Sequence, residues 1–256
     1  MKMSKKAIQI LSVVLATMCA MGTSAFAAEG IDPMTGVAQE TKVQTTTLSI
    51  DTTGEKEIST DGHTTTYQLA DGSYRLEIGS GDKDASLNAT EEGESRGIHD
   101  ASMLGGVNSF YGKVNYENEE FLYSFYNATG YRVTYLRPNY AIPQGAKVIK
   151  AEMVLQTYTT GSIALGVREA KDTWKEDTIT WDNQPGFSSK VTTQLAVNRN
   201  NTKYAFDLTN AVPSWMKKGA EWPGVVLYSG AISCIFYSSE NSNVAARPVF
   251  NVYYTK

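Results

Sequence analysis

Hydrophobic and polar residues alternate in short runs along most of the chain, and turn-forming residues separate the runs. The clearest case is residues 64–78 (TTTYQLADGSYRLEI), where apolar and polar positions alternate on both sides of Asp71-Gly72. Such alternation is typical of half-buried strands, and an Asp-Gly pair supplies the positive φ angles that tight hairpin turns require. The segment therefore predicts a β-hairpin.

Strand-like patterns continue to the C-terminus, with turn residues between them. They cover residues 131–136, 147–158, 162–167, 202–208, 224–228, 233–237 and 249–254, and a weaker, threonine-rich run covers residues 43–50. Many short strands with regular turns predict an all-β fold, an antiparallel β-sandwich or jelly roll.

One segment departs from the strand pattern. In residues 207–216 the apolar residues Leu208, Val212, Trp215 and Met216 have the spacing of one helix face. We expect a short helix that caps the sandwich and ends near Gly219.

The N-terminus has the three parts of a secretory signal. Lysines at positions 2, 5 and 6 precede an apolar stretch over residues 7–21, and Ala25-Phe26-Ala27 forms a small-residue cleavage motif. A membrane anchor would need about 20 consecutive apolar residues, and this run is shorter and interrupted by polar residues. We therefore expect residues 1–27 to be a signal peptide and the mature protein to be secreted, extracellular or cell-wall associated.

Composition divides the rest of the chain into three parts. Residues 28–41 are polar and predict a flexible leader, and residues 42–95 form a β-rich N-terminal extension that ends in a glycine-rich linker. Residues 96–256 hold the predicted sandwich domain.

Charge and cysteine content narrow the function. Removing the signal takes three of the 23 basic residues and none of the 27 acidic ones, so the mature chain carries a net charge of −7. Nucleic acids and anionic lipids bind basic surfaces, so we expect neither as a partner, and no membrane insertion after cleavage. Cys234 is then the single cysteine, and its apolar surroundings predict a buried thiol.

The sequence offers little for catalysis. The mature chain has two histidines, and it contains no HExxH, CxxC or phosphate-binding glycine loop. A pair of glycosidase carboxylates is not excluded by counting, but scattered acidic residues are ordinary in an acidic protein. We expect no enzyme activity.

Six segments occur in the order typical of one family of exported proteins. They are residues 100–111 (DASMLGGVNSFY), 131–138 (YRVTYLRP), 142–153 (IPQGAKVIKAEM), 174–185 (WKEDTITWDNQP), 207–215 (DLTNAVPSW) and 238–248 (SSENSNVAARP). Together they resemble the DNRLRE domain family of bacterial and archaeal surface proteins, which is partly classed as carbohydrate-binding modules. The resemblance implies a structural role for the motif residues Trp174, Glu176, Trp181, Asn183, Pro185, Asp207, Trp215, Arg247 and Pro248. Arg137 departs from the pattern, since the family usually has a hydrophobic residue there.

Aromatic residues in polar contexts are candidates for sugar stacking, because flat rings pack against the apolar faces of sugars. The candidates are Tyr111, Tyr116, Tyr140 and Trp222. Basic residues that alternate on neighbouring strands could share one sheet face and bind carboxylates of an acidic polysaccharide. These are Arg132, Arg137, Lys150 and Arg168. Exposed tyrosines and a solvated outer face would produce the same patterns, so both interpretations stay open.

Asp172, Asp177 and Asp182 could supply oxygen ligands to a structural calcium ion, although their spacing matches no defined calcium loop. We expect no other cofactor. The sequence thus favours a secreted, non-catalytic carbohydrate-binding module for cell-wall or environmental polysaccharide. The alternative is a structural or adhesive surface module with no sugar ligand.

Overall fold

A computed structural model describes residues 49–79, 97–106, 115–116, 118–127, 130–229 and 233–256. These residues belong to one compact unit, residues 42–256. The predicted signal peptide and leader, and most of the predicted linker, lie outside the described residues.

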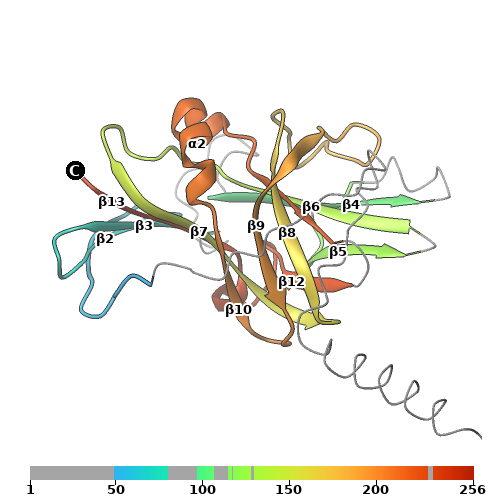
Figure 1. Cartoon of the computed structure of the whole chain (residues 1–256), viewed down its shortest axis with the longest axis horizontal. Coiled ribbons are helices and arrows are strands. Elements are labelled where there is room, and N and C mark those ends of the chain that lie inside the picture. The colour runs from blue at the N-terminus through green and yellow to red at the C-terminus, as the bar shows by residue number, and fades with distance from the viewer. Residues whose placement is uncertain (1–48, 80–96, 107–114, 117, 128–129, 230–232) are drawn as a thin grey trace, which may run out of the picture. The chain divides into compact units, whose positions relative to one another are not determined.

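The described residues form an antiparallel β-sandwich with one short α-helix (Figure 1), which confirms the predicted fold class. The strands are β1 (Lys56–Thr60), β2 (Thr64–Gln68), β3 (Tyr74–Gly79), β4 (Ile98–Gly106), β5 (Phe121–Asn127), β6 (Gly130–Pro138), β7 (Lys147–Thr160), β8 (Ile163–Ala170), β9 (Phe187–Val197), β10 (Lys203–Asp207), β11 (Val225–Tyr228), β12 (Cys234–Tyr237) and β13 (Val249–Thr255).

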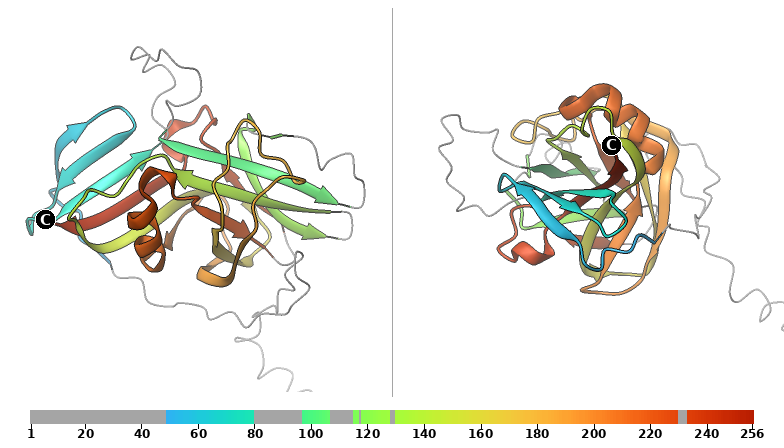
Figure 2. Two further views of the ribbon diagram at one scale, coloured as in Figure 1. Left: turned by 90° about the horizontal axis from the view of Figure 1, so that it is seen from above. Right: turned by 90° about the vertical axis from the view of Figure 1, so that its left-hand side faces the viewer.

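Two layers of strands enclose the main core. The first layer has the order β1-β2-β3-β13-β7, with β10 also paired to β7. The second has the order β6-β11-β8-β9, with β4 paired to β6, and β12 and β5 connect β7 to β6. Figures 1 and 2 show how strongly the strands twist, so that β8, β9 and β10 run steeply across β4, β5 and β6. Pronounced twist is expected of such sheets.

The main core lies between these layers. Met153 and Phe250 of the first layer and Leu136 and Leu165 of the second are fully buried in one apolar cluster. Cys234 is buried in the same cluster, as predicted, and burial raises the pKa of its thiol to about 11.

The predicted helix is confirmed as α2 (Val212–Lys218). Pro213 lies in the first turn, where its missing N–H costs no hydrogen bond. Trp215 of α2 is fully buried and stacks on Trp222, with ring centroids 4.9 Å apart.

The predicted hairpin is confirmed as β2 and β3. Gly72 in its turn has a φ angle of 83°, which is the positive φ that the Asp-Gly pair predicts. The hairpin is not a separate body, because β3 pairs with β13 over Tyr74–Gly79 and so extends the first layer. Strand β1 has a polar sequence and is exposed along its length, which explains why no apolar pattern marked it.

Three further segments differ from the sequence expectation. β5 (FLYSFYN) is rich in consecutive aromatic residues and shows no clean alternation, and β9 is polar with irregular pairing to β8. Of the run at residues 43–50, only Ser49 and Ile50 are described, and they lie in no strand. No helix of the described segments has the length and apolar character needed to cross a membrane.

A candidate carbohydrate-binding face

Strands β7, β12 and β5 lie side by side and carry aromatic residues on one face. On β5 exposure alternates: Phe121 and Tyr123 are partly exposed, whereas Leu122 and Ser124 are buried. Tyr237 of β12 is directly opposite Phe121, so the two side chains share a face. These residues therefore point away from the core.

β7 adds Tyr158 to the same face, next to a β-bulge. The pairing of β7 with β12 shifts register between Ile235 and Phe236, which leaves Tyr158 without a directly opposite partner. The Tyr158 side chain is 49% exposed. Its outward direction follows the alternation along β7, in which Leu155 and Thr157 are buried and Gln156 and Tyr158 are not.

The rings of Phe121, Tyr158 and Tyr237 are in mutual contact, and Tyr123 lies two residues along β5 on the same side of that strand. We name these four residues the aromatic face. The centroid of Phe121 is 4.8 Å from that of Tyr158 and 5.6 Å from that of Tyr237, and the two tyrosines are 5.9 Å apart. All three pairs are tilted or edge-on, within the range of favourable aromatic contacts.

Polar groups border this face on two sides. The Arg132 guanidinium of β6 lies over the rings of Tyr123 and Tyr116, 4.4 Å and 4.7 Å from their centroids, and donates a 2.8 Å hydrogen bond to Glu119. The Tyr237 hydroxyl lies 3.3 Å from Asn201 Oδ1. Two residues from the sequence analysis, Tyr116 and Arg132, are thus brought together at the edge of the aromatic face.

Two other predicted aromatic residues lie elsewhere, and Tyr111 is outside the described residues. The Tyr140 hydroxyl donates a hydrogen bond to Asp61 in the turn between β1 and β2. Trp222, expected in an exposed turn, is fully buried against Trp215. That expectation is corrected: a Trp-Pro sequence marks the turn, but the indole points into the core.

The expectation of one shared basic face is also corrected. Lys150 lies on β7 in the first layer and is buried in an ion pair with Glu152, 2.6 Å from Nζ to Oε2. Arg132 and Arg137 are five residues apart on β6, which places them on opposite faces of that strand. Arg168 of β8 is 2% exposed, with its guanidinium 4.6 Å from the Tyr228 ring centroid.

The segment that connects β8 to β9 covers the outer face of the second layer. Trp174 is buried there, donates a 2.9 Å hydrogen bond to the Pro223 carbonyl, and lies 5.5 Å from the Arg137 guanidinium. Trp181 packs against Gly105 of β4, where a Cβ atom would come within 2.4 Å of the indole. The glycine of the 100–111 motif is therefore what lets Trp181 approach the sheet.

Polar motif residues fix the same connecting segment. Asn183 accepts a hydrogen bond from the Thr180 N–H and donates one to the Thr178 carbonyl, and Glu176 accepts the Asp100 N–H at 2.9 Å. The Pro185 carbonyl accepts the Tyr135 hydroxyl.

The remaining motif residues hold turns. Asp207 accepts the Thr209 N–H before α2 at 2.8 Å, and Arg247 donates to the Asn241 carbonyl at 2.7 Å. Pro248 is buried at the start of β13. These contacts give the motif residues structural roles; Asn183 is exposed, and the others are buried or half-buried.

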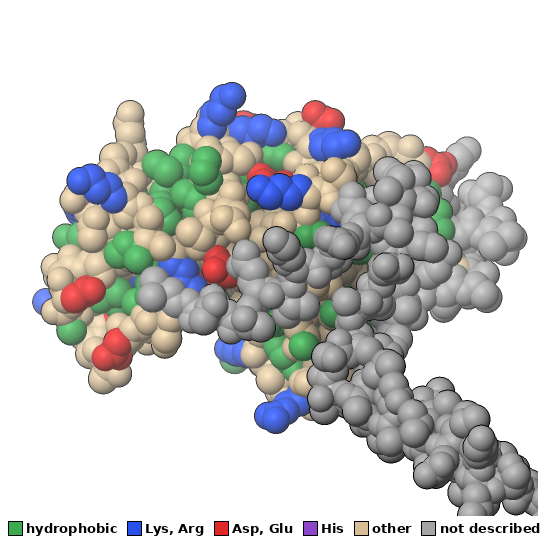
Figure 3. All heavy atoms as spheres, viewed as in Figure 1, with side chains coloured by type: hydrophobic (Ala, Val, Ile, Leu, Met, Phe, Trp, Pro, Cys, Tyr) green, Lys and Arg blue, Asp and Glu red, His purple; other side chains and the backbone are tan. Residues whose placement is uncertain are grey.

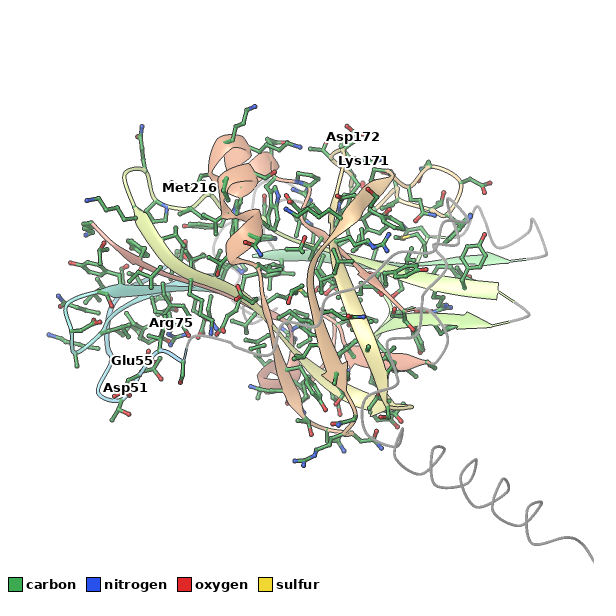
Figure 4. All side chains as sticks on the ribbon, viewed as in Figure 1. Asp51, Glu55, Arg75, Lys171, Asp172 and Met216 are labelled. Carbon is green, nitrogen blue, oxygen red and sulfur yellow. The ribbon has the colours of Figure 1, made fainter. Side chains whose placement is uncertain are left out.

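The acidic residues proposed as calcium ligands do not converge. Asp172, Asp177 and Asp182 are all exposed, and Figure 4 shows Asp172 beside Lys171 on the loop after β8. Within the described parts of the chain, one group of three acidic side chains could hold a metal ion: Asp100, Glu176 and Glu240.

Charges on the visible surface are mixed. On the side drawn in Figure 3, Lys and Arg side chains of the described residues are interspersed with Asp and Glu side chains. This arrangement differs from the basic stripe that nucleic-acid binding favours.

Sequence reasoning missed Phe121, Tyr158 and Tyr237. Tyr123, the fourth residue of the aromatic face, lies on β5. The run FLYSFY was an available signal, since aromatic residues favour strands. Tyr158 had a signal as well, because it continues the outward positions Val154 and Gln156 of β7.

Comparison with known proteins agrees with this geometry. A search of curated proteins gives no match. The model of carbohydrate-binding module family 96 matches residues 107–252, more than half of the chain. The matched range contains every residue of the aromatic face. The chain therefore belongs to carbohydrate-binding module family 96.

Proposed function

We propose that the protein is a secreted, non-catalytic module that binds a cell-wall or environmental polysaccharide on its aromatic face. The observation that carries the proposal is the contact among three rings from β5, β7 and β12, with Tyr158 about half exposed. A contiguous apolar patch on the surface of a protein often marks a binding site.

The face has the physical properties that sugars require. Rings offer a large apolar area, and they lose little conformational entropy because each side chain has two rotatable bonds. Their neighbours on adjacent strands hold them in place before a ligand arrives, which lowers the cost of binding. Arg132 and Asn201 at the border offer hydrogen bonds to sugar hydroxyls.

Two observations support a non-catalytic role. Carbohydrate-binding modules are usually non-catalytic. Within the described ranges, one group of three acidic side chains comes together: Asp100, Glu176 and Glu240. Each of them is less than a tenth exposed. A polysaccharide cannot reach these carboxylates, so this cluster is no candidate for the pair of carboxylates that must flank the bond in a glycosidase.

Export is the second part of the proposal and rests on the signal-like N-terminus. Expression with the full N-terminus in a secreting bacterial host should release a protein that begins at Ala28. N-terminal sequencing of the secreted material checks this, and a retained protein that still begins at Met1 would contradict it. The resemblance of the six sequence motifs to the DNRLRE family fits a surface location.

Affinity electrophoresis tests the binding proposal. The mature protein is run through gels that contain single neutral or acidic polysaccharides, and we expect retardation by at least one of them. Tyr158→Ala with Tyr237→Ala should abolish the retardation. Tyr67→Ala, on β2 and separated from β7 by β3 and β13, is the matched control and should be retarded like the wild type.

The same glycans separate the alternatives. Reducing ends released from the retarding polysaccharide would contradict the non-catalytic role. Uniform failure to bind would contradict the module's proposed ligand and favour the structural or adhesive interpretation.

A further inference from the structure

Three carboxylates from distant parts of the chain meet in the interior. Asp100 lies on β4, Glu176 on the segment after β8, and Glu240 follows β12. Each is less than a tenth exposed, and one carboxylate oxygen of each lies within 4.8 Å of the others. The three belong to none of the surfaces discussed above for sugar binding.

Hydrogen bonds position these carboxylates. Asp100 Oδ2 accepts the Ser239 N–H at 2.8 Å, and Glu240 Oε1 accepts the Ser239 hydroxyl at 2.7 Å. Glu176 Oε1 accepts the Asp100 N–H, and its Oε2 lies 2.9 Å from His99 Nδ1. The group is thus built from both side chains and backbone, and is not a chance encounter of flexible residues.

The Asp100 carboxylate has an unused oxygen. The residue is 1% exposed, and with Oδ2 occupied by Ser239, its Oδ1 accepts no hydrogen bond from an N–H or hydroxyl group of the described residues. The carboxyl groups of Asp100 and Glu240 can hydrogen-bond to each other only by sharing a proton. A buried polar atom left unpaired costs about 1–3 kcal/mol, and native structures rarely leave one without a purpose such as an ion.

The local charge points in the same direction. Where the three carboxylates are ionised they repel one another, because one oxygen of each lies within 4.8 Å of the others in a buried setting. Arg137 is close enough to Glu176 to interact with its charge. A cation between the three carboxylates would offset this repulsion.

We propose that Asp100, Glu176 and Glu240 form a calcium-binding site that fastens three segments of the sandwich together. Oxygen atoms that are each 2.3–2.6 Å from one Ca²⁺ lie no more than about 5 Å apart, and the three oxygens meet this limit. Hard carboxylate ligands suit Ca²⁺ and not the softer metals that prefer sulfur and imidazole. The same residues replace the exposed aspartates as the site of the expected structural calcium.

A calcium ion here would act on stability. It would tie β4, the segment carrying Trp174 and Trp181, and the turn after β12, and it would bind the native state and not the unfolded chain. Calcium at 100 times its Kd should raise Tm by about 5–10 °C for a chain of this size.

The test uses the mature protein, first analysed for metal as purified and then dialysed against a chelator. Isothermal titration calorimetry with CaCl₂ should give one site per chain, and thermal unfolding should show the Tm rise with Ca²⁺. Glu240→Gln and Asp100→Asn should each remove both effects. Asp172→Asn is the matched control because it neutralises an exposed aspartate, and it should keep both.

The two variants also guard against a folding artefact. Circular dichroism without calcium should show both as folded, and Glu240→Gln alone decides the result if Asp100→Asn unfolds. The proposal is overturned if the wild type contains and binds no Ca²⁺, or if Glu240→Gln binds it like the wild type. It is equally overturned if Ca²⁺ leaves the Tm of the wild type unchanged. None of these outcomes depends on sugar binding.

Discussion

At the scale of single residues, the structure separates aromatic side chains that sequence alone does not distinguish. Trp222 and Trp215 stack in the core, whereas Tyr158 projects from a bulge. The difference comes from which way each side chain points: Trp215 lies on the buried side of α2, and Tyr158 lies on the outward side of β7.

Trp222→Ala should destabilise the fold by about 3–5 kcal/mol, because it removes a fully buried aromatic side chain and leaves a cavity. Urea unfolding measures the effect. Met216→Ala on the exposed side of α2 should change the stability by less than about 0.5 kcal/mol. Loss of sugar binding in Trp222→Ala without loss of stability would instead return Trp222 to the ligand site.

Asp61 should make stability depend on acid pH. Partial burial works to raise its pKa, but hydrogen bonds from the Tyr140 hydroxyl and the N–H groups of Thr64 and His63 outweigh burial and lower the pKa to about 2. Because the folded pKa is below the unfolded value of about 4, this contribution is present above pH 4 and is lost as the pH falls from about 4 to about 2.

The difference in Tm between wild type and Asp61→Asn measures this contribution. It should favour the wild type at pH 6 and shrink progressively below pH 4. A difference that stays constant from pH 6 to pH 2.5 would show that the Asp61 charge contributes nothing.

At the scale of elements, the N-terminal hairpin is part of the sandwich even though the family match begins at residue 107. β3 pairs with β13 along six residue pairs, and Leu76 and Ile78 are buried in the main core. The hydrophobic core therefore includes residues that precede the range matched by the family.

A chain that begins at residue 96 should be less stable than one that begins at residue 42. It would lose the buried contacts of Leu76 and Ile78 and expose the edge of β13, which promotes aggregation. Thermal unfolding and size-exclusion chromatography compare the two chains. Equal Tm values and equal monomer yields would mean that the hairpin is a dispensable attachment.

Element-scale predictions from sequence succeeded where a pattern was local. The Asp71-Gly72 hairpin and the helix ending at Gly219 depend on nearby residues, and both are found. β5 and β9 escaped prediction because consecutive aromatic residues in one and polar residues in the other hide the alternation.

At the scale of the whole molecule, the fold class could be predicted and the candidate site could not. The aromatic face joins residues 121, 158 and 237, and their proximity depends on β7, β12 and β5 being neighbours. Nothing local fixes that order, and the bulge at Tyr158 arises from pairing. The carboxylate cluster depends in the same way on contacts between residues 100, 176 and 240.

The most direct test of the central claim is calorimetric titration of the mature protein with a short oligosaccharide from the polysaccharide that retards it. Tyr158→Ala and Tyr237→Ala should each weaken binding by about tenfold, equivalent to ~1.4 kcal/mol, with Tm close to that of the wild type. Tyr67→Ala should leave the Kd unchanged. Wild-type affinity in both face variants would contradict the account, because sugar recognition would then lie elsewhere on the molecule.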